Sequence, residues 1–139
     1  MRRRAEPRRV TVRADPRAAG PVRQRSERRP KVRAGDSEVL LSARELGEPL
    51  GERATLVQFS SAFCQPCRAT RRTLEEVAAM VDGVAHVELD AEAQLGLVRQ
   101  LDIRKTPTVL VLDADGRIVR RASGQPRRAD VIAALGHAV

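Results

Sequence analysis

The chain has 139 residues, the length of one ordinary domain, and a formal net charge of +8 at pH 7. The excess charge lies in residues 1–35, where 13 Arg or Lys face 3 Asp or Glu; residues 36–139 carry 13 against 15. No apolar run in the basic segment approaches the ~20 residues of a membrane span or the apolar core of a signal peptide. The sequence therefore favours neither a membrane nor a secreted protein, and it predicts a cytoplasmic location.

Residues 1–35 form an Arg- and Pro-rich segment with no Leu, Ile or aromatic residue. Such a segment cannot bury enough apolar surface to offset an ordering entropy of roughly 1–2 kcal/mol per residue. We therefore expect a disordered basic tail, followed by one folded domain over residues 36–139. The tail is either simply solvated or makes weak contacts with nucleic acid or an acidic surface, because a run of like charge can neutralise phosphates. It lacks the aromatic side chains that stack on bases.

Apolar residues recur with regular spacing from residue 36 onward, and they predict alternating strands and helices. Ser42 and Glu45 have the spacing of a capping box, and Asp115-Gly116 has the composition of a hairpin turn. The expected elements, in chain order, are a strand at 38–41, a short helix ending near 47–49, a strand at 54–60, a helix at 66–81, a strand at 84–90, a helix at 92–101, strands at 108–112 and 117–121, and a closing helix around 131–135.

The three longer helices are each expected to bury an apolar stripe. This order of elements predicts an α/β fold in which a central mixed sheet is covered by helices on both faces. The stripes comprise Leu74, Val77, Ala78 and Val81 in the first helix, Leu95, Val98 and Leu101 in the second, and Val131, Ile132 and Leu135 in the third.

Cys64 and Cys67, the only two cysteines, lie at the junction between the strand at 54–60 and the helix that follows it. The first thiol of such a motif sits at a helix N-terminus, where unpaired backbone N–H groups and the helix dipole favour negative charge. We therefore expect the Cys64 thiolate to form more readily than that of a free cysteine. Cys67, one turn later and facing inward, would be the resolving thiol. Pro66 suits the first helical turn, where a missing N–H costs nothing.

Three other interpretations of the cysteine pair stay open. A zinc site needs four ligands, and the spacing of His86 and His137 relative to the cysteines fits no zinc module. A structural disulfide that closes so short a loop removes little chain entropy and would be reduced in the cytosol. Two inert buried thiols would leave the strand-to-helix position of the pair unexplained.

Four segments of the chain resemble the thioredoxin family in their order and spacing. They are Phe59-Ser60-Ser61-Ala62-Phe63-Cys64-Gln65-Pro66-Cys67-Arg68, Val87-Glu88-Leu89-Asp90, Thr106-Pro107-Thr108 and Gly124. The resemblance covers roughly residues 38–138. It implies the thioredoxin fold and a cis peptide bond before Pro107, in a loop beside the cysteines. It also implies that Cys64 and Cys67 are catalytic and need no cofactor or metal. The implied substrate-contact residues are Phe63, Gln65, Pro66, Thr106, Pro107 and Gly124.

The chain departs from the family pattern at several positions around the cysteines. Phe63 stands where Trp is common, and Gln65 stands where Gly is common, so the motif is FCQPC; the aromatic residue often found at Ser60 is absent. Gln58 aligns with a buried Asp that accepts a proton behind the second cysteine, and His86 aligns with the Lys partner of that Asp. Gln takes up no proton at any useful pH, so the replacement either only removes a costly buried charge pair or also slows deprotonation of Cys67. His86 is either a base, if its side chain faces the cysteines, or a paired histidine of the strand.

The resemblance implies a protein-disulfide reductase that acts on protein disulfides and is recharged by a thioredoxin-reductase-like electron donor. The alternative is a thioredoxin-fold adaptor or redox sensor with little turnover, in which the basic tail is the working part. A third possibility is a peroxide-reducing relative, which would use a cysteine supported by a nearby Thr and Arg. Thr70 and Arg68 are close to the cysteines in the sequence, but the paired CXPC favours disulfide exchange.

Overall fold

The computed structural model describes residues 39–139, and the expected tail of residues 1–35 lies outside them. Four strands form one sheet in the order β2-β1-β3-β4. The strands are β1 (Ala54–Ser60), β2 (Val84–Asp90), β3 (Thr108–Asp113) and β4 (Ile118–Ser123). Strands β1 and β2 are parallel, whereas β3 is antiparallel to both β1 and β4, so the sheet is mixed as expected.

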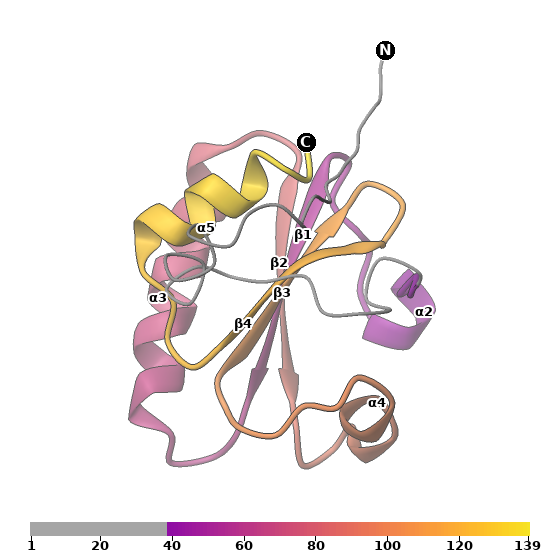
Figure 1. The fold of residues 1–139 in the computed structure, drawn as a ribbon, viewed down its shortest axis with the longest axis vertical. Helices are drawn as coiled ribbons and strands as arrows, with labels where there is room; N and C mark the ends of the chain where they lie inside the picture. The colour runs from indigo at the N-terminus through magenta and orange to yellow at the C-terminus, as the bar shows by residue number, and fades with distance from the viewer. Residues whose placement is uncertain (1–38) are drawn as a thin grey trace, which may run out of the picture.

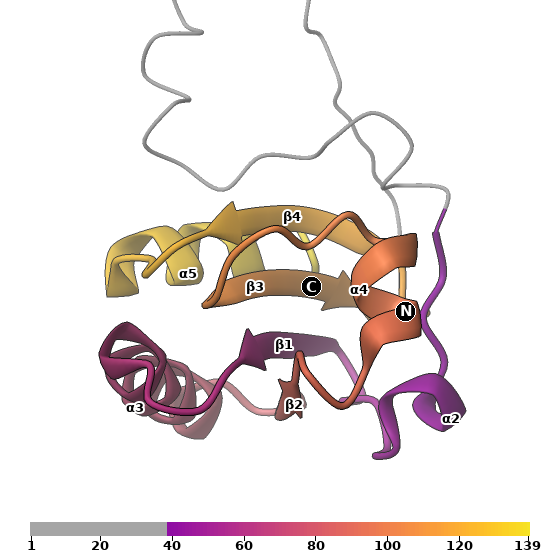
Figure 2. The ribbon, with the colours of Figure 1, turned by 90° about the horizontal axis from the view of Figure 1, so that it is seen from below.

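Helices cover both faces of the sheet (Figures 1 and 2). Helices α3 and α5 lie on one side, whereas α2 and α4 lie on the other. The helices are α2 (Ala43–Leu46), α3 (Gln65–Met80), α4 (Leu95–Gln100) and α5 (Arg128–Leu135). The expected thioredoxin fold is therefore present.

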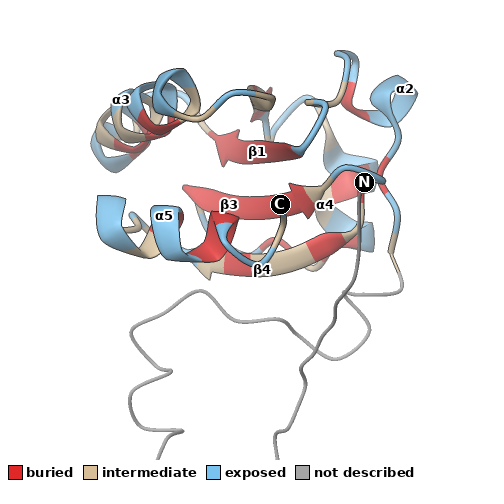
Figure 3. Ribbon diagram, turned by 90° about the horizontal axis from the view of Figure 1, so that it is seen from above, coloured by how far each residue is buried: buried red, intermediate tan, exposed pale blue. Residues whose placement is uncertain are grey.

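The sheet separates two apolar clusters, because successive side chains of a strand point to opposite faces. Val57 and Phe59 of β1 pack on the α2 and α4 side with Leu46, Leu97 and other residues. On the other side, Leu56 of β1 packs with side chains of α3 and α5, namely Leu74, Val77, Val131, Ala134 and Leu135. Strands β1 and β3 lie in the middle and are buried along nearly their whole length, as Figure 3 shows. A strand buried on both faces gives the cysteine motif that follows β1 a rigid base.

The prediction of a strand at 38–41 was wrong for residues 39–41, the part of it that the structure describes. Residue 38 lies outside them, and Leu40 makes only an isolated bridge to Arg117. The expected capping box follows this segment: Ser42 Oγ accepts from the backbone N–H of Glu45, and the Glu45 carboxylate accepts from the backbone N–H of Ser42. Ser42 is the N-cap of α2, so the chain turns into the helix directly after Leu41. Before it, only the bridge at Leu40, with backbone bonds from Leu41 to Gly116 and from Ile118 to Val39, joins the segment to the β3–β4 hairpin.

Two expected core residues are exposed. Leu95 is 53% exposed, because α4 begins only at that residue; a turn at Asp90, whose side chain accepts from the backbone N–H of Glu92, precedes it. Leu101 is buried as expected, and Leu97 is buried in place of Leu95. Ile132 of α5 is 43% exposed, and Val131, Ala134 and Leu135 form the buried side of that helix. Short helices have too few turns for spacing alone to fix which side is buried.

Candidate redox site

The two cysteines lie where β1 passes into α3, at the lower end of the molecule in Figure 1. They are joined by a disulfide, with their Cα atoms 5.2 Å apart. Cys64 is the N-cap of α3, and its Sγ accepts a hydrogen bond from the backbone N–H of Cys67 at 3.2 Å. Cys64 is half-buried and Cys67 is buried. This is the arrangement expected of an accessible attacking thiol and a protected resolving thiol.

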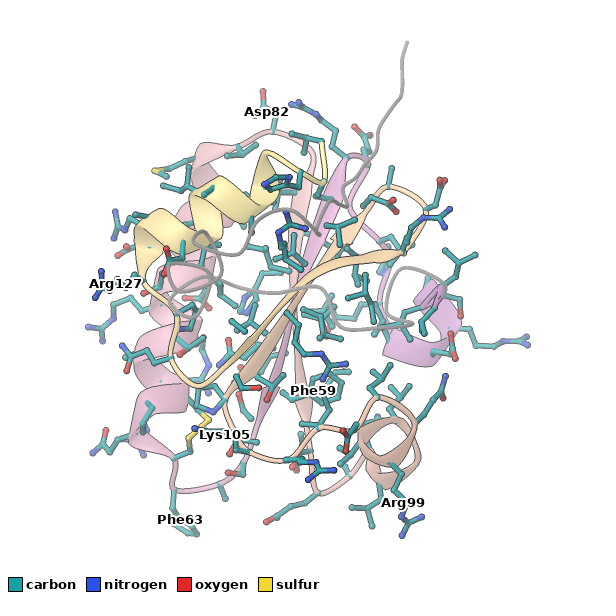
Figure 4. All side chains as sticks on the ribbon, viewed as in Figure 1. Phe59, Phe63, Asp82, Arg99, Lys105 and Arg127 are labelled. Carbon is teal, nitrogen blue, oxygen red and sulfur yellow. A yellow bond between two sulfur atoms is a disulfide. The ribbon has the colours of Figure 1, made fainter. Side chains whose placement is uncertain are left out.

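The exposed side of the motif is formed by the residues around Cys64. Phe63 adopts a left-handed backbone conformation with φ 61°, which is uncommon for a bulky residue and costs energy. Its side chain is 98% exposed and projects from the lower end of the molecule in Figure 4. Gln65 and Pro66 are also exposed, on the first turn of α3. An outward aromatic ring at this point is available to a docking protein.

The loop before β3 lies against the cysteines. The Thr106–Pro107 peptide bond is cis, as the family resemblance implies. Thr106 Oγ1 lies 4.0 Å from Cys64 Sγ and donates to it. Gly124 closes the neighbouring loop: its backbone N–H donates to the carbonyl of Pro107 at 2.7 Å, and its φ of 94° suits glycine. The structure therefore brings Cys64, Thr106, Pro107 and Gly124 together.

Gln58 lies directly behind the second cysteine. Its side chain is completely buried, and its amide nitrogen donates to the Cys67 carbonyl at 2.8 Å and to Ser60 Oγ at 2.9 Å. Its amide oxygen lies 3.1 Å from His86 Nε2. Because both amide protons are used by Cys67 and Ser60, the amide oxygen faces His86. All the polar atoms of this buried side chain are therefore paired.

The orientation of Gln58 determines which ring nitrogen of His86 carries a proton. An amide oxygen only accepts, so His86 Nε2 must carry the proton and donate it. That nitrogen therefore cannot act as a base toward Cys67. Burial lowers the pKa of His86 below its ordinary value, although nearby Glu88 opposes this shift. His86 is thus a paired, half-buried histidine of the edge strand β2.

Glu88 ends this row of polar groups near the surface. Arg71 of α3 binds the Glu88 carboxylate with two nitrogens, at 2.7 and 2.9 Å. The hydrogen bond from Arg71, followed by one from Ser60, lowers the pKa of Glu88 below its ordinary value. Glu88 therefore stays ionised at neutral pH. Behind Cys67 there are therefore two paired polar groups: Arg71 with Glu88, and Gln58 with Ser60 and the backbone of Cys67.

The residues from 39 onward contain no group of three or more His, Cys, Asp or Glu side chains placed to hold a metal ion. Within the same part of the chain, no helix is both long and apolar enough to cross a membrane. Thr70, one turn after Cys67, is fully buried, and its hydroxyl has no hydrogen-bond partner among the described residues.

The family model described as Thioredoxin matches residues 42–137. The chain belongs to the thioredoxin family. It is 30% identical over 90 residues to a thioredoxin of Mycolicibacterium smegmatis, which covers 63% of this chain and 80% of the relative. It is 37% identical over 79 residues to a thioredoxin of Alicyclobacillus acidocaldarius, which covers 55% of this chain and 74% of the relative.

The fold is also similar to that in a crystal structure of a complex of ferredoxin:thioredoxin reductase with thioredoxin f2. The TM-score is 0.54 at 22% identity, and the match covers 62% of this chain and 77% of that one. At this identity the likeness supports the thioredoxin fold alone.

Ser61 is a site residue that the sequence did not single out. Its hydroxyl lies 2.8 Å from Thr106 Oγ1. In the antiparallel pairing of β1 with β3, Phe59 lies opposite Thr108, so two residues further along β1 the chain faces Thr106. The spacing of residues along the sequence does not reveal this register, and without it nothing indicates that Ser61 lies next to Thr106 and so close to Cys64.

His86→Gln is expected to reduce the loss of stability on acidification. Because the folded-state pKa of His86 is lowered, the unfolded chain takes up the proton first. The stabilisation from neutral His86 is therefore present above its ordinary pKa, ~6.5, and is lost as the pH falls below it. Gln can donate to Gln58 but does not titrate. Urea unfolding measures the free energy of unfolding at pH 7 and at pH 5. The decrease from pH 7 to pH 5 should be larger for the unaltered protein than for His86→Gln. Equal losses would contradict this assignment.

Proposed function

We propose that this protein is a thiol:disulfide oxidoreductase of thioredoxin type that reduces protein disulfides. One observation carries the proposal. Cys64 Sγ is the N-cap of α3 and accepts from the Cys67 N–H at 3.2 Å, while Cys67 is buried within disulfide distance. A thiolate at this position is stabilised by backbone donors, and a second thiol is in place to complete the exchange.

Reduction of a substrate proceeds in two exchanges. The Cys64 thiolate attacks one sulfur of the substrate disulfide, forming a mixed disulfide and releasing the other substrate sulfur as a thiolate. Cys67, once deprotonated, then attacks Cys64 Sγ. The Cys64–Cys67 disulfide forms, and the second substrate sulfur leaves as a thiolate that takes up a proton. Two electrons have passed from the protein to the substrate, and no cofactor beyond the cysteine pair takes part.

The second exchange lacks a dedicated base. Gln58 occupies the position behind Cys67, and its amide nitrogen donates to the Cys67 carbonyl. Gln58 therefore positions the backbone of the resolving cysteine but takes no proton from its thiol. His86 Nε2 is occupied by Gln58. The proton of Cys67 must then leave to solvent or to the departing substrate sulfur, which makes resolution the slower exchange.

The substrate docks on the surface formed by Phe63, Gln65 and Pro66 on one side and, on the other, by the loop of Thr106 and the buried Pro107 together with Gly124. The outward Phe63 ring supplies apolar contact area. The loop at Pro107 lies against Cys64, so a strand of substrate placed there would present its disulfide to that sulfur.

A thioredoxin-reductase-like enzyme is the proposed electron donor, and the cytoplasm is the proposed location. A protein of similar fold, thioredoxin f2, forms a complex with ferredoxin:thioredoxin reductase, which supports a reductase of this class as the partner. The reducing poise of the cytosol would keep Cys64 and Cys67 available as thiols.

The test is the reduction of insulin disulfides by dithiothreitol, followed by the precipitation of the released chain. The intact chain and a chain that begins at Asp36 are both expected to accelerate this reaction to a similar extent, because the described site lies within residues 39–139. An adaptor that works through residues 1–35 would instead accelerate it little in either form. Equal rates with and without the intact protein would overturn the proposal.

A further inference from the structure

Two hydroxyl groups lie in line beside Cys64. Thr106 Oγ1 is 4.0 Å from Cys64 Sγ, and Ser61 Oγ is 2.8 Å from Thr106 Oγ1. Ser61 and Thr106 come from different segments: Ser61 directly follows β1, and Thr106 lies in the loop before β3. Both residues are half-buried, so bulk water competes only partly for their hydroxyl groups.

The protons of the two hydroxyl groups can be assigned by counting. Each hydroxyl has one proton to donate. The Thr106 proton points to Cys64 Sγ, because a disulfide sulfur can only accept. With the Thr106 proton directed at Cys64 Sγ, the 2.8 Å bond between the two hydroxyls is the one that Ser61 donates. The direction is therefore from Ser61 to Thr106 to Cys64, and each bond polarises the next.

The loop that carries Thr106 is also held by two hydrogen bonds that do not involve the Thr106 hydroxyl. The neighbouring Thr108 already ties the loop through its own hydroxyl, which donates to the Lys105 carbonyl at 2.6 Å. The backbone of Gly124 donates to Pro107 from the other side. With the loop fixed by these two bonds, the contact from Thr106 acts on the sulfur.

We propose that Ser61 and Thr106 form a hydroxyl relay that stabilises the Cys64 thiolate and thereby makes the cysteine couple more oxidising. Thr106 is a catalytic residue, because it contacts the reacting sulfur, and Ser61 is a positioning residue that acts through Thr106. In the reduced protein Cys64 carries negative charge, and hydrogen bonds to a charged acceptor are about twice as strong as those to a neutral one. The relay therefore favours the reduced form over the disulfide. This inference rests on the proposed function, since it concerns the same sulfur.

The experiment is the rate of alkylation of Cys64 by iodoacetamide as a function of pH, in the reduced full chain. Thr106→Val removes the donor and keeps the shape of the side chain. Loss of one charge-assisted hydrogen bond is expected to lower the fraction of Cys64 present as thiolate about tenfold, at any pH below the midpoint of its titration. Because a more basic thiolate is also more nucleophilic, the alkylation rate at acidic pH should fall about threefold, and the midpoint of the profile should move to higher pH. The glutathione equilibrium should move severalfold toward the disulfide.

The relay also predicts how the two residues depend on each other. Ser61→Ala should produce a smaller change in the same direction, and it should have no further effect in a protein that already carries Thr106→Val, because Ser61 acts only through Thr106. Thr106→Ser keeps the hydroxyl and should restore most of the unaltered profile. Thr73→Val, the same chemical change at a half-buried threonine further along α3, is the matched control.

Unchanged pH profiles in both Thr106→Val and Ser61→Ala would overturn the relay, as would additive effects of the two changes. A changed profile that came only from misfolding would be recognised by an altered circular dichroism spectrum and by the absence of recovery in Thr106→Ser. Alkylation requires no substrate turnover. A relay that fails in a protein that still reduces insulin leaves the proposed function standing, whereas an unaltered protein without turnover overturns the function and not the relay.

Discussion

Replacing Cys64 by serine is expected to abolish disulfide exchange, and replacing Cys67 by serine is expected to trap the substrate on the protein. A serine hydroxyl is not ionised near neutral pH, so nothing at position 64 can attack a disulfide. Insulin reduction should then fall to the level seen with dithiothreitol alone. In Cys67→Ser the attacking sulfur is intact, but the mixed disulfide has no internal thiol to break it.

Mass spectrometry should detect this trapped species as a one-to-one adduct between Cys67→Ser and a substrate with one disulfide. Addition of dithiothreitol should release the substrate. The matched control is Cys64→Ser, which keeps the buried Cys67 and should form no adduct, because Cys67 is only about 1% exposed. If Cys64→Ser formed the adduct and Cys67→Ser did not, the roles of the two cysteines would be reversed.

The chemistry of the site was predictable because local rules fix it. A Cys-X-Pro-Cys at the end of a buried strand must begin a helix, and the structure has Cys64 at the N-cap and Pro66 in the first turn. The cis bond at Pro107 and the closeness of Gly124 followed from the resemblance, and both are confirmed. Gly116 in the hairpin turn, with φ 91°, was likewise determined by its neighbours in the sequence.

The features that could not be predicted depend on contacts between distant segments. Spacing cannot tell that Gln58 turns its amide nitrogen to Cys67 and its oxygen to His86, since the choice is made by three partners from β1, α3 and β2. The contact of Ser61 with Thr106 depends in the same way on the register of β1 against β3. The exposure of Leu95 arises because a turn at Asp90 delays the start of α4.

Gln58→Leu is expected to destabilise the protein by about 2–4 kcal/mol, a large part of the roughly 5–15 kcal/mol that holds a domain folded. The side chain is fully buried, and its amide group satisfies the Cys67 carbonyl and His86 Nε2. Leucine fits a buried site of this size, but His86 Nε2 then loses its acceptor and Ser60 Oγ loses a donor, while the Cys67 carbonyl keeps only its hydrogen bond within α3. A buried polar group left without a partner costs about 1–3 kcal/mol. Chemical denaturation at pH 7, with the cysteines oxidised, measures the difference.

The double variant Gln58→Leu with His86→Phe distinguishes unpaired polar groups from simple misfit. Removing both members of a buried hydrogen bond costs less than removing one, because no donor is then left without an acceptor. We therefore expect the double variant to be less destabilised than the sum of the two single variants, by about 0.5–2 kcal/mol. Part of the loss must remain, since Ser60 Oγ and the Cys67 carbonyl still lack the donor that Gln58 supplies. Strictly additive losses would mean that His86 and Gln58 are not coupled, and the protonation assigned to His86 would then have no basis.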